Sequence, residues 1–100
     1  MTNTDWIDET ADTYPDPMLR MDGYDDCVVG VVERFGCQPA FLYDREKVIL
    51  RLMEDGMDRE EAEEFHEFNQ AGAYLGEGTP AFLLEWAPRQ PAATPDTAIQ

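Results

Sequence analysis

Basic residues are scarce in this chain of 100 residues. Seven Lys and Arg stand against 22 Asp and Glu, which gives a formal net charge of −15. Seven scattered cations cannot form the basic patch that nucleic-acid binding requires. A surface of this charge attracts basic surfaces instead, most of which bind DNA or RNA in a cell. The same composition also serves solubility alone or a halophilic host, so net charge does not by itself assign a function.

Long apolar runs and targeting signals are also missing. No apolar run approaches the roughly 20 residues that cross a bilayer. The N-terminal sequence MTNTDWIDETADTYPDP lacks the basic and apolar regions of a signal peptide. The two cysteines, Cys27 and Cys37, form neither a CxxC pair nor a zinc-binding spacing. We therefore expect a cytoplasmic protein with reduced thiols, although a single disulfide stays open.

The sequence also lacks the residue patterns that are typical of catalytic sites. The chain has one histidine, His66, and no Gly-rich phosphate loop. Glu63-x-x-His66 resembles half of a carboxylate-bridged di-metal site, but such a site needs a second copy of the motif. Abundant carboxylates do not make an acid–base site without a pocket that separates their pKa values. We expect a non-enzymatic protein with no catalytic residue, metal or cofactor.

The chain divides into three parts by composition. Residues 1–22 are acidic and interrupted by Pro15 and Pro17, which predicts a flexible N-terminal arm. Docking of this arm on the domain or on a partner stays open through its apolar residues Trp6, Ile7, Tyr14, Met18, Leu19 and Met21. Residues 87–100 are rich in Pro, Ala and Thr and are expected to be a disordered tail. Residues 23–86 carry the patterned apolar residues of a single α+β domain. Its small core is marginally stabilising, so an extra helix or a homodimer partner would add to it.

The first element of this domain has apolar residues at helical spacing, namely Val28, Val31, Val32 and Phe35. Asp25 or Asp26 can cap such a helix, and Gly36 can end it. The β-branched valines keep a strand open as the alternative. Adjacent pairs of valines break strict alternation, so we favour the helix.

Two further helices are expected between two short strands. Asp44 caps a helix that ends at Gly56 and whose inner face is Val48, Ile49, Leu52 and Met53. Asp58 and Glu61 form a capping box for the next helix, whose inner stripe is Ala62, Phe65, Asn69 and Gly72. Residues 39–43 and 79–86 read as strands that pair with each other. The fold class predicted is α+β, with about three helices packed on a two-stranded antiparallel sheet.

Several large side chains have expected positions as well. The strand residues Phe41, Phe82, Leu84 and Trp86 are expected in the core and sheet. Trp6, Tyr24 and Tyr74 are candidates for amphipathic anchors at an interface.

The acidic third helix is the most informative feature. From Glu54 to Glu67 there are eight acids and one arginine, Arg59. Like charges at i,i+3 and i,i+4 cost a few tenths of a kcal/mol each, and interspersed lysines would avoid that cost. The outer arc therefore predicts either a solvated face or a partner-binding surface. The candidate surface is Glu60, Glu61, Glu63, Glu64 and Glu67, with Asp55, Asp58, Asp25 and Asp26 at its periphery.

Three segments resemble a group of small acidic phage and prophage proteins. They are GYDDCVVGVVERFG (23–36), YDREKVILRLMEDGM (43–57) and EFNQAGAYLGEGTPAFL (67–83). The likeness extends to neither the arm nor the tail, and it carries no catalytic residue. It implies a viral or mobile-element origin. Small acidic phage proteins include anti-CRISPR and anti-restriction inhibitors that imitate DNA.

Two functions follow as hypotheses. The first is a phage-encoded inhibitor that presents an acidic, DNA-mimicking surface to the basic nucleic-acid-binding site of a host nuclease or CRISPR effector. The alternative is a small phage structural or regulatory adaptor that binds its partner through apolar contacts, without DNA mimicry. Neither binds nucleic acid or membrane directly, and both act in the host cytoplasm.

Overall fold

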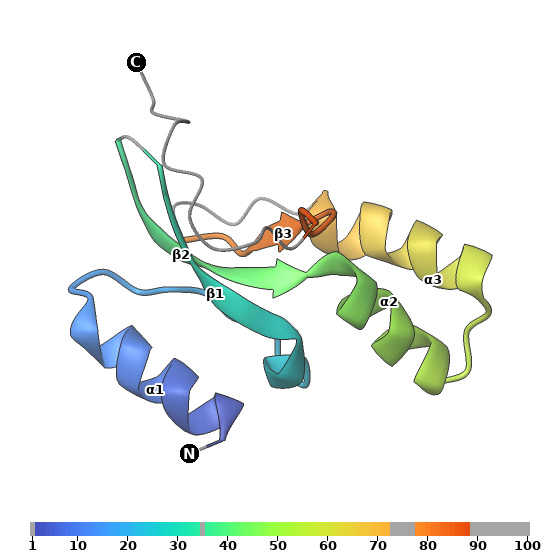
Figure 1. Ribbon diagram of the computed structural model, residues 1–100, viewed down its shortest axis with the longest axis horizontal. Coiled ribbons are helices and arrows are strands. Elements are labelled where there is room, and N and C mark those ends of the chain that lie inside the picture. The colour runs from blue at the N-terminus through green and yellow to red at the C-terminus, as the bar shows by residue number, and fades with distance from the viewer. Residues whose placement is uncertain (1, 35, 73–77, 89–100) are drawn as a thin grey trace.

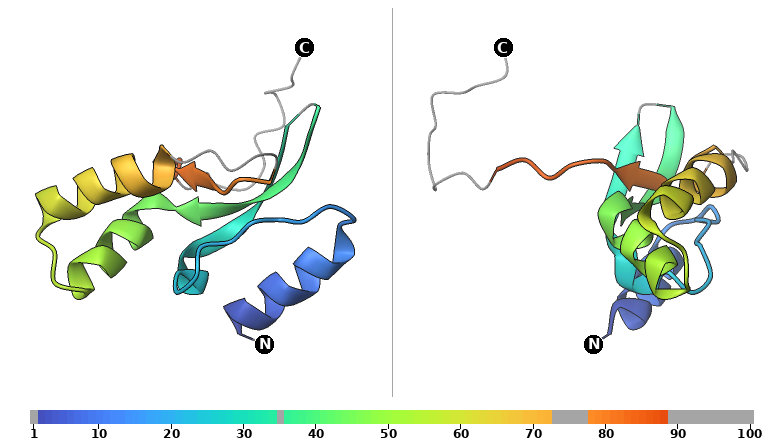
Figure 2. Two further views of the ribbon diagram at one scale, coloured as in Figure 1. Left: turned by 180° about the vertical axis from the view of Figure 1, so that it is seen from behind. Right: turned by 90° about the vertical axis from the view of Figure 1, so that its right-hand side faces the viewer.

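The computed structural model describes residues 2–34, 36–72 and 78–88 and places them in a mixed α+β fold (Figure 1). In these ranges the elements are, in chain order, α1 (Asn3–Thr13), the 3-10 turn η1 (Asp25–Cys27), β1 (Val28–Arg34), β2 (Cys37–Asp44), α2 (Arg45–Glu54), α3 (Arg59–His66), the π-helix η2 (Glu67–Ala71) and β3 (Ala81–Leu83). Two further views show α2 and α3 lying side by side (Figure 2).

The strands form one mixed sheet in the order β1-β2-β3. β1 and β2 are antiparallel, whereas β2 and β3 are parallel, with Leu42 opposite Ala81 and Asp44 opposite Leu83. The predicted pairing of the last strand with residues 39–43 is confirmed. Its antiparallel direction and the two-stranded sheet are wrong. Parallel neighbours need a crossover connection, and α2 and α3 provide one between β2 and β3.

The favoured helix at the start of the domain is also wrong, because β1 is a strand. Val31 pairs with Phe41 of β2, and the register shifts between Val28 and Gly30 and between Val32 and Arg34. Such irregularities explain why adjacent valines broke the alternation that a regular strand shows. Gly36 has a φ of 79°, but it lies in the turn between two strands and not at a helix end. Phe35 lies outside the described residues.

The predicted N-terminal arm is instead largely helical. Thr2 and Asp5 form a capping box at the start of α1. Ile7 is fully buried, and the Trp6 ring packs edge-on against Phe41 with the centroids 6.3 Å apart. The prolines at 15 and 17 follow the helix and do not interrupt it. The folded body therefore includes α1.

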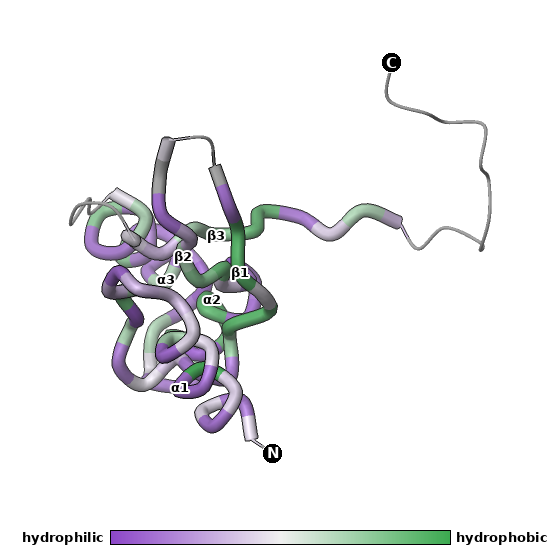
Figure 3. Tube along the Cα trace, turned by 90° about the vertical axis from the view of Figure 1, so that its left-hand side faces the viewer, coloured by the Kyte–Doolittle hydropathy of each residue, from purple (hydrophilic) through white to green (hydrophobic). Residues whose placement is uncertain are grey.

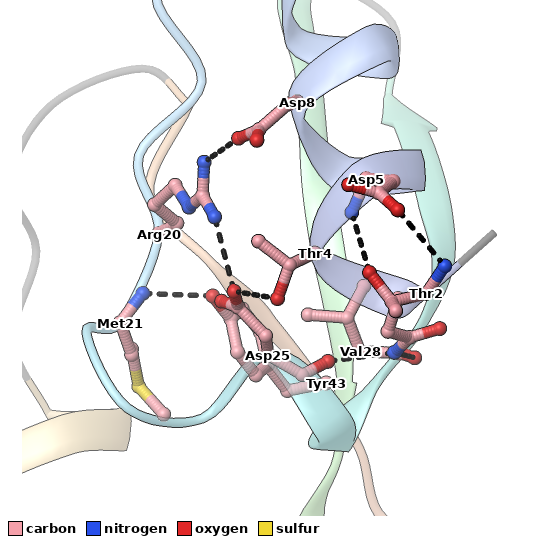
Figure 4. Close-up of polar contacts among 10 residues, drawn as sticks. Thr2, Thr4, Asp5, Asp8, Arg20, Met21, Asp25, Val28 and Tyr43 are labelled. Atoms are coloured by element: carbon pink, nitrogen blue, oxygen red, sulfur yellow. Dashed lines mark hydrogen bonds and ion pairs between the residues drawn. The ribbon is translucent and has the colours of Figure 1, made fainter.

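Polar contacts fasten α1 to the segment before β1 (Figure 4). The Arg20 guanidinium donates to the Asp8 carboxylate of α1 at 2.6 Å and to Asp25 at 3.1 Å. The Thr4 hydroxyl donates to the same Asp25 carboxylate at 2.8 Å, and the Asn3 amide donates to the Asp25 carbonyl at 2.6 Å. Asp25 thus joins two parts of the chain and is not the cap of a long helix.

The two predicted helix starts after β2 are confirmed. Asp44 Oδ1 accepts from the backbone N–H of Glu46 at 2.9 Å, which caps α2. Asp58 and Glu61 form the predicted capping box of α3, with the Glu61 N–H donating to Asp58 at 2.9 Å. On α2, the expected inner residues Val48, Ile49 and Leu52 are buried.

The inner face of α3 differs from its predicted stripe. Ala62 is buried as expected, but the next buried residue is His66, which is 1% exposed. Phe65 is 37% exposed and Asn69 is exposed, so both lie toward the outside. His66 packs edge-on against Phe82, with ring centroids 4.6 Å apart. This contact turns the histidine inward and leaves Phe65 on the surface.

The core lies where the strands meet α1, α2 and the start of α3. Along the traced chain β3 and the inner parts of β1 and β2 are hydrophobic, whereas α1 is mostly hydrophilic (Figure 3). Phe41 is fully buried and Phe82 packs against the core, as predicted. Leu84 and Trp86 are 77% and 61% exposed, because β3 ends at Leu83 and the chain beyond it leaves the sheet. Of the predicted tail, residues 89–100 lie outside the described residues.

Replacing Ile7 with alanine tests whether α1 belongs to the folded body. Removing a fully buried isoleucine side chain is expected to lower the free energy of unfolding by about 2–5 kcal/mol. Urea unfolding followed by circular dichroism measures this change. The matched control is Glu9→Ala on the exposed side of α1, which should change stability by less than about 0.5 kcal/mol. An unchanged midpoint for Ile7→Ala would mean that α1 is detached in solution.

Candidate partner-binding surface

The five predicted glutamates of the acidic row do not share one environment. Glu63 lies beside two arginines, with the Arg59 Nε 3.3 Å and the Arg45 Nη1 4.0 Å from its carboxylate. Glu67 lies 4.0 Å from Arg45. Arg45 belongs to α2 and Arg59 lies on α3 within reach of α2, so the side of the row next to α2 is partly neutralised.

Arg59 also joins the two helices directly. Its Nη1 and Nη2 atoms lie 2.7 and 2.8 Å from the two carboxylate oxygens of Glu46 on α2. A bidentate pair of this kind is among the stronger charge-assisted contacts. The hydrogen bond from Arg59 holds the pKa of Glu46 below its ordinary value.

The remaining acids of the row lie on the outer side of α3. Glu60, Glu61 and Glu64 are exposed. Within residues 2–34, 36–72 and 78–88, no arginine or lysine forms an ion pair with any of them. Glu61 uses one oxygen in the capping box, where it accepts from the Asp58 N–H at 3.3 Å. The uncompensated part of the row is therefore three residues and not five.

The predicted peripheral acids are dispersed over the molecule. Asp55 lies 3.7 Å from Arg51 at the end of α2, and Asp58 is the cap of α3. Asp25 is held by Arg20 in the α1 network. Asp26 lines a separate shallow hollow of about 260 Å³ with side chains of α2. The structure does not gather these four acids into one surface with α3.

A groove that the sequence did not predict lies on the outer side of α3 and η2, beside Glu61 and Glu64. We call it the outer groove; it has a volume of about 330 Å³ and is lined by Met57, Glu61, Glu64, Phe65, Phe68 and Asn69. Phe68 is 80% exposed, which is unusual for a phenylalanine in a folded domain. The groove therefore combines two carboxylates with exposed aromatic rings.

The π-helix η2 continues α3 and contributes Phe68 to this groove. The Gly72 N–H donates to the Glu67 carbonyl five residues earlier at 3.0 Å, the bond that defines a π turn. A Cβ atom at Gly72 would come within 2.8 Å of that same carbonyl oxygen, so the turn requires glycine. On the inner side, His66 Nδ1 lies 2.8 Å from the Gln70 side-chain oxygen. Single π turns within helices are frequent at functional sites.

The misplacement of Phe65 has a physical explanation. Regular α-helical spacing from Ala62 through Asn69 predicts Phe65 on the inner face. The packing of His66 on Phe82 instead sets that face at Ala62 and His66, and the π turn begins only after Phe65. The available signal was two phenylalanines, at 65 and 68, within a helix otherwise dominated by glutamate.

A second hollow adjoins the outer groove and shares Phe65 and Asn69 with it. This inner groove also measures about 330 Å³, and its lining is mostly apolar: Leu19, Arg20, Met21, Asp22, Tyr24, Phe65, Asn69, Gln70, Pro80 and Phe82. Of the predicted interface anchors, Tyr24 lies here and is half-buried, whereas Trp6 packs against the core. Tyr74 lies outside the described residues.

The histidine and the buried cysteine, which could in principle take part in catalysis or metal binding, have structural surroundings. His66 is buried at the core edge, and its neighbour Glu63 is paired with arginines. Among the described residues no group of three or more His, Cys, Asp or Glu side chains is arranged to hold a metal ion. Cys27 is a free, buried thiol whose pKa is raised by burial and further by Asp26. β1 and its turn, not a helix, separate Cys27 from Cys37.

No family model, curated protein or solved structure matches this chain. In the ranges 2–34, 36–72 and 78–88, none of the helices has the length and apolar character that a bilayer crossing requires.

Replacing Arg59 with glutamine tests the charge pairing between α2 and α3. Loss of the bidentate hydrogen bonds should raise the pKa of Glu46 toward its ordinary value, measured by an NMR pH titration of the side-chain carboxyl. A carboxyl whose pKa is lowered by folding stabilises the protein above its unfolded-state pKa, and this contribution is lost as the pH falls. The stability difference between wild type and variant should therefore shrink toward acid pH. Arg20→Gln, at the α1 network, serves as the control and should leave Glu46 unchanged.

Proposed function

We propose that this chain is a non-enzymatic binding protein that engages a basic macromolecular partner through the outer face of α3 and η2. The observation that carries the proposal is the outer groove, where Phe65 and Phe68 are exposed beside Glu61 and Glu64. Protein interfaces commonly combine aromatic anchors at the centre with a polar rim. Here the rim is acidic, so a partner with cationic groups around an apolar contact is favoured.

The net charge supports an electrostatic contribution to this binding. A chain with a formal charge of −15 is drawn toward basic surfaces and away from nucleic acid. Such attraction acts mainly on the association rate and weakens with salt. Contacts with Phe65 and Phe68 would supply specificity at short range.

The narrower proposal is a phage-encoded inhibitor that occupies the nucleic-acid-binding site of a host nuclease or CRISPR effector. The resemblance to small acidic phage proteins and the excess of acids support it. The ion pairs of Arg45 and Arg59 with Glu63 and Glu67 argue against a continuous DNA-like row of charges. Inhibition would therefore depend on the outer groove as well as on charge.

A phage structural or regulatory adaptor remains the second candidate. The exposure of Phe68, Leu84 and Trp86 favours it, since an apolar interface needs such side chains at the surface. The two candidates differ in their salt dependence. At about 0.5 M salt the screening length is about 4 Å, so an attraction based on charge is largely lost and an apolar interface persists.

Capture from lysate with matched variants tests the binding function. The double variant Phe68→Ala/Glu64→Gln should lose about 90% or more of the partner that wild type retains, since it removes an anchor and a rim charge. Glu9→Gln/Asp12→Asn, which removes two exposed acids of α1, should retain it. Quantitative mass spectrometry at low salt and at about 0.5 M salt provides the measurement.

The same captured complex separates the candidates. An inhibitor of a nucleic-acid-binding protein should release its partner when duplex DNA is added, because both compete for one basic site. An adaptor should keep its partner in DNA and at high salt. Equal capture by wild type and by the Phe68→Ala/Glu64→Gln variant would rule out this face as the binding surface.

A further inference from the structure

The outer groove has the chemistry to recognise one type of side chain. Its lining brings the ring of Phe68, the thioether of Met57 and the carboxylates of Glu61 and Glu64 into one hollow. A purely aliphatic ligand would make no favourable contact with the two carboxylates, and an anionic ligand would be repelled by them. A cation with an apolar stem matches both parts of the lining, because such side chains place their methylenes on apolar surface and their charge toward water.

Arginine fits this lining better than lysine. A guanidinium is planar and weakly hydrated, it stacks on aromatic faces, and it can donate to two acceptors at once. Phe68 is 80% exposed, so its ring faces are accessible to such a group. Glu64 precedes Phe68 by four residues and lines the same groove, and Glu61, one turn before Glu64, offers a further acceptor in that groove.

The four arginines whose ion pairs the structure describes do not pair with these acceptors. Arg20, Arg45, Arg51 and Arg59 are each within 4.0 Å of other carboxylates. Among the described residues none of them pairs with Glu61 or Glu64. The groove carboxylates therefore remain for a cation from outside the described fold.

We infer that the outer groove binds an arginine side chain of the partner, with the guanidinium stacked on Phe68 and hydrogen-bonded to Glu64 and to the free oxygen of Glu61. This inference rests on the proposed binding function and names the group recognised. It also explains how a face with three uncompensated glutamates distinguishes among basic partners, since general charge attraction does not separate arginine from lysine.

The test is an NMR titration of the isotope-labelled full chain with a synthetic probe. The probe is an alanine-based helical peptide that carries two arginines four positions apart and no acid. Lysine and citrulline versions of the same peptide complete the set. We expect shift changes confined to residues 57–69, with affinity falling from the arginine to the lysine to the citrulline peptide. Phe68→Leu and Glu64→Gln should each weaken the arginine peptide by roughly two- to fivefold.

Glu9→Gln is the matched control, since it removes one exposed carboxylate from α1. It should leave the affinity for the arginine peptide unchanged, and circular dichroism checks that all variants remain folded. Equal weakening by Glu64→Gln and Glu9→Gln, or equal affinity for arginine and lysine, would overturn the arginine site. The arginine site would also be overturned if the peptide caused no chemical-shift changes in residues 57–69. Chemical-shift changes in these residues on dilution of the protein alone would likewise overturn it, because they would indicate a second copy of the chain in the groove. The lysate capture decides the binding function independently of these results.

Discussion

The Asp44 carboxylate is the contact on which the arrangement of elements depends. It is 7% exposed and lies at the junction of β2 and α2. One oxygen caps α2 by accepting from the Glu46 N–H, and the other accepts from the Trp86 indole at 2.7 Å. A buried carboxylate is stable only when its acceptor sites are filled. This group therefore fixes where the central strand ends, how α2 leaves it, and where the chain runs after β3.

The position of α3 follows from that of α2. Arg59 and Arg45 connect the helices by ion pairs with Glu46 and Glu63, and Ala62 and His66 pack inward. Arg45 and Arg59 are thus used within the fold, where they neutralise one side of the acidic helix. The other side keeps its charge beside exposed aromatic rings. The composition alone suggests a uniformly acidic surface, but the acidic helix has one side neutralised by arginines and another that is charged and aromatic.

Local sequence signals predicted the parts of the fold that depend on neighbouring residues. The caps at Asp44 and Asp58 mark the starts of α2 and α3 because a side-chain oxygen and the backbone N–H groups it accepts from lie within one turn. β1 was misread because its bulges disturb the alternation that identifies a strand. The direction of β3 was beyond local signals, since it depends on how the chain returns across the sheet.

The candidate surface was predicted only in part for a similar reason. The glutamates of α3 are visible in the sequence, but their pairing depends on arginines that tertiary structure brings near. The helix α1 was missed because its acidic composition predicts a flexible arm, and only the packing of Ile7 in the core shows which side of the segment is buried. Phe65 was misplaced because the inward position of His66 depends on Phe82, which is 16 positions further along the chain. Both errors arise from contacts between distant segments.

The π turn has a consequence for how this surface could change during evolution. A π-helix contains one residue more per turn than an α-helix in the same place, so loss of one residue from 67–71 would restore regular geometry. Each residue of an α-helix advances by about 100°, so the residues after the deletion would rotate by that amount. Loss of Gln70 or Ala71 would leave the acidic rim and Phe68, which precede them, in place while the residues that follow turned. Chain length at this position thus offers a route to altered surroundings of the groove that leaves the charge of the protein untouched.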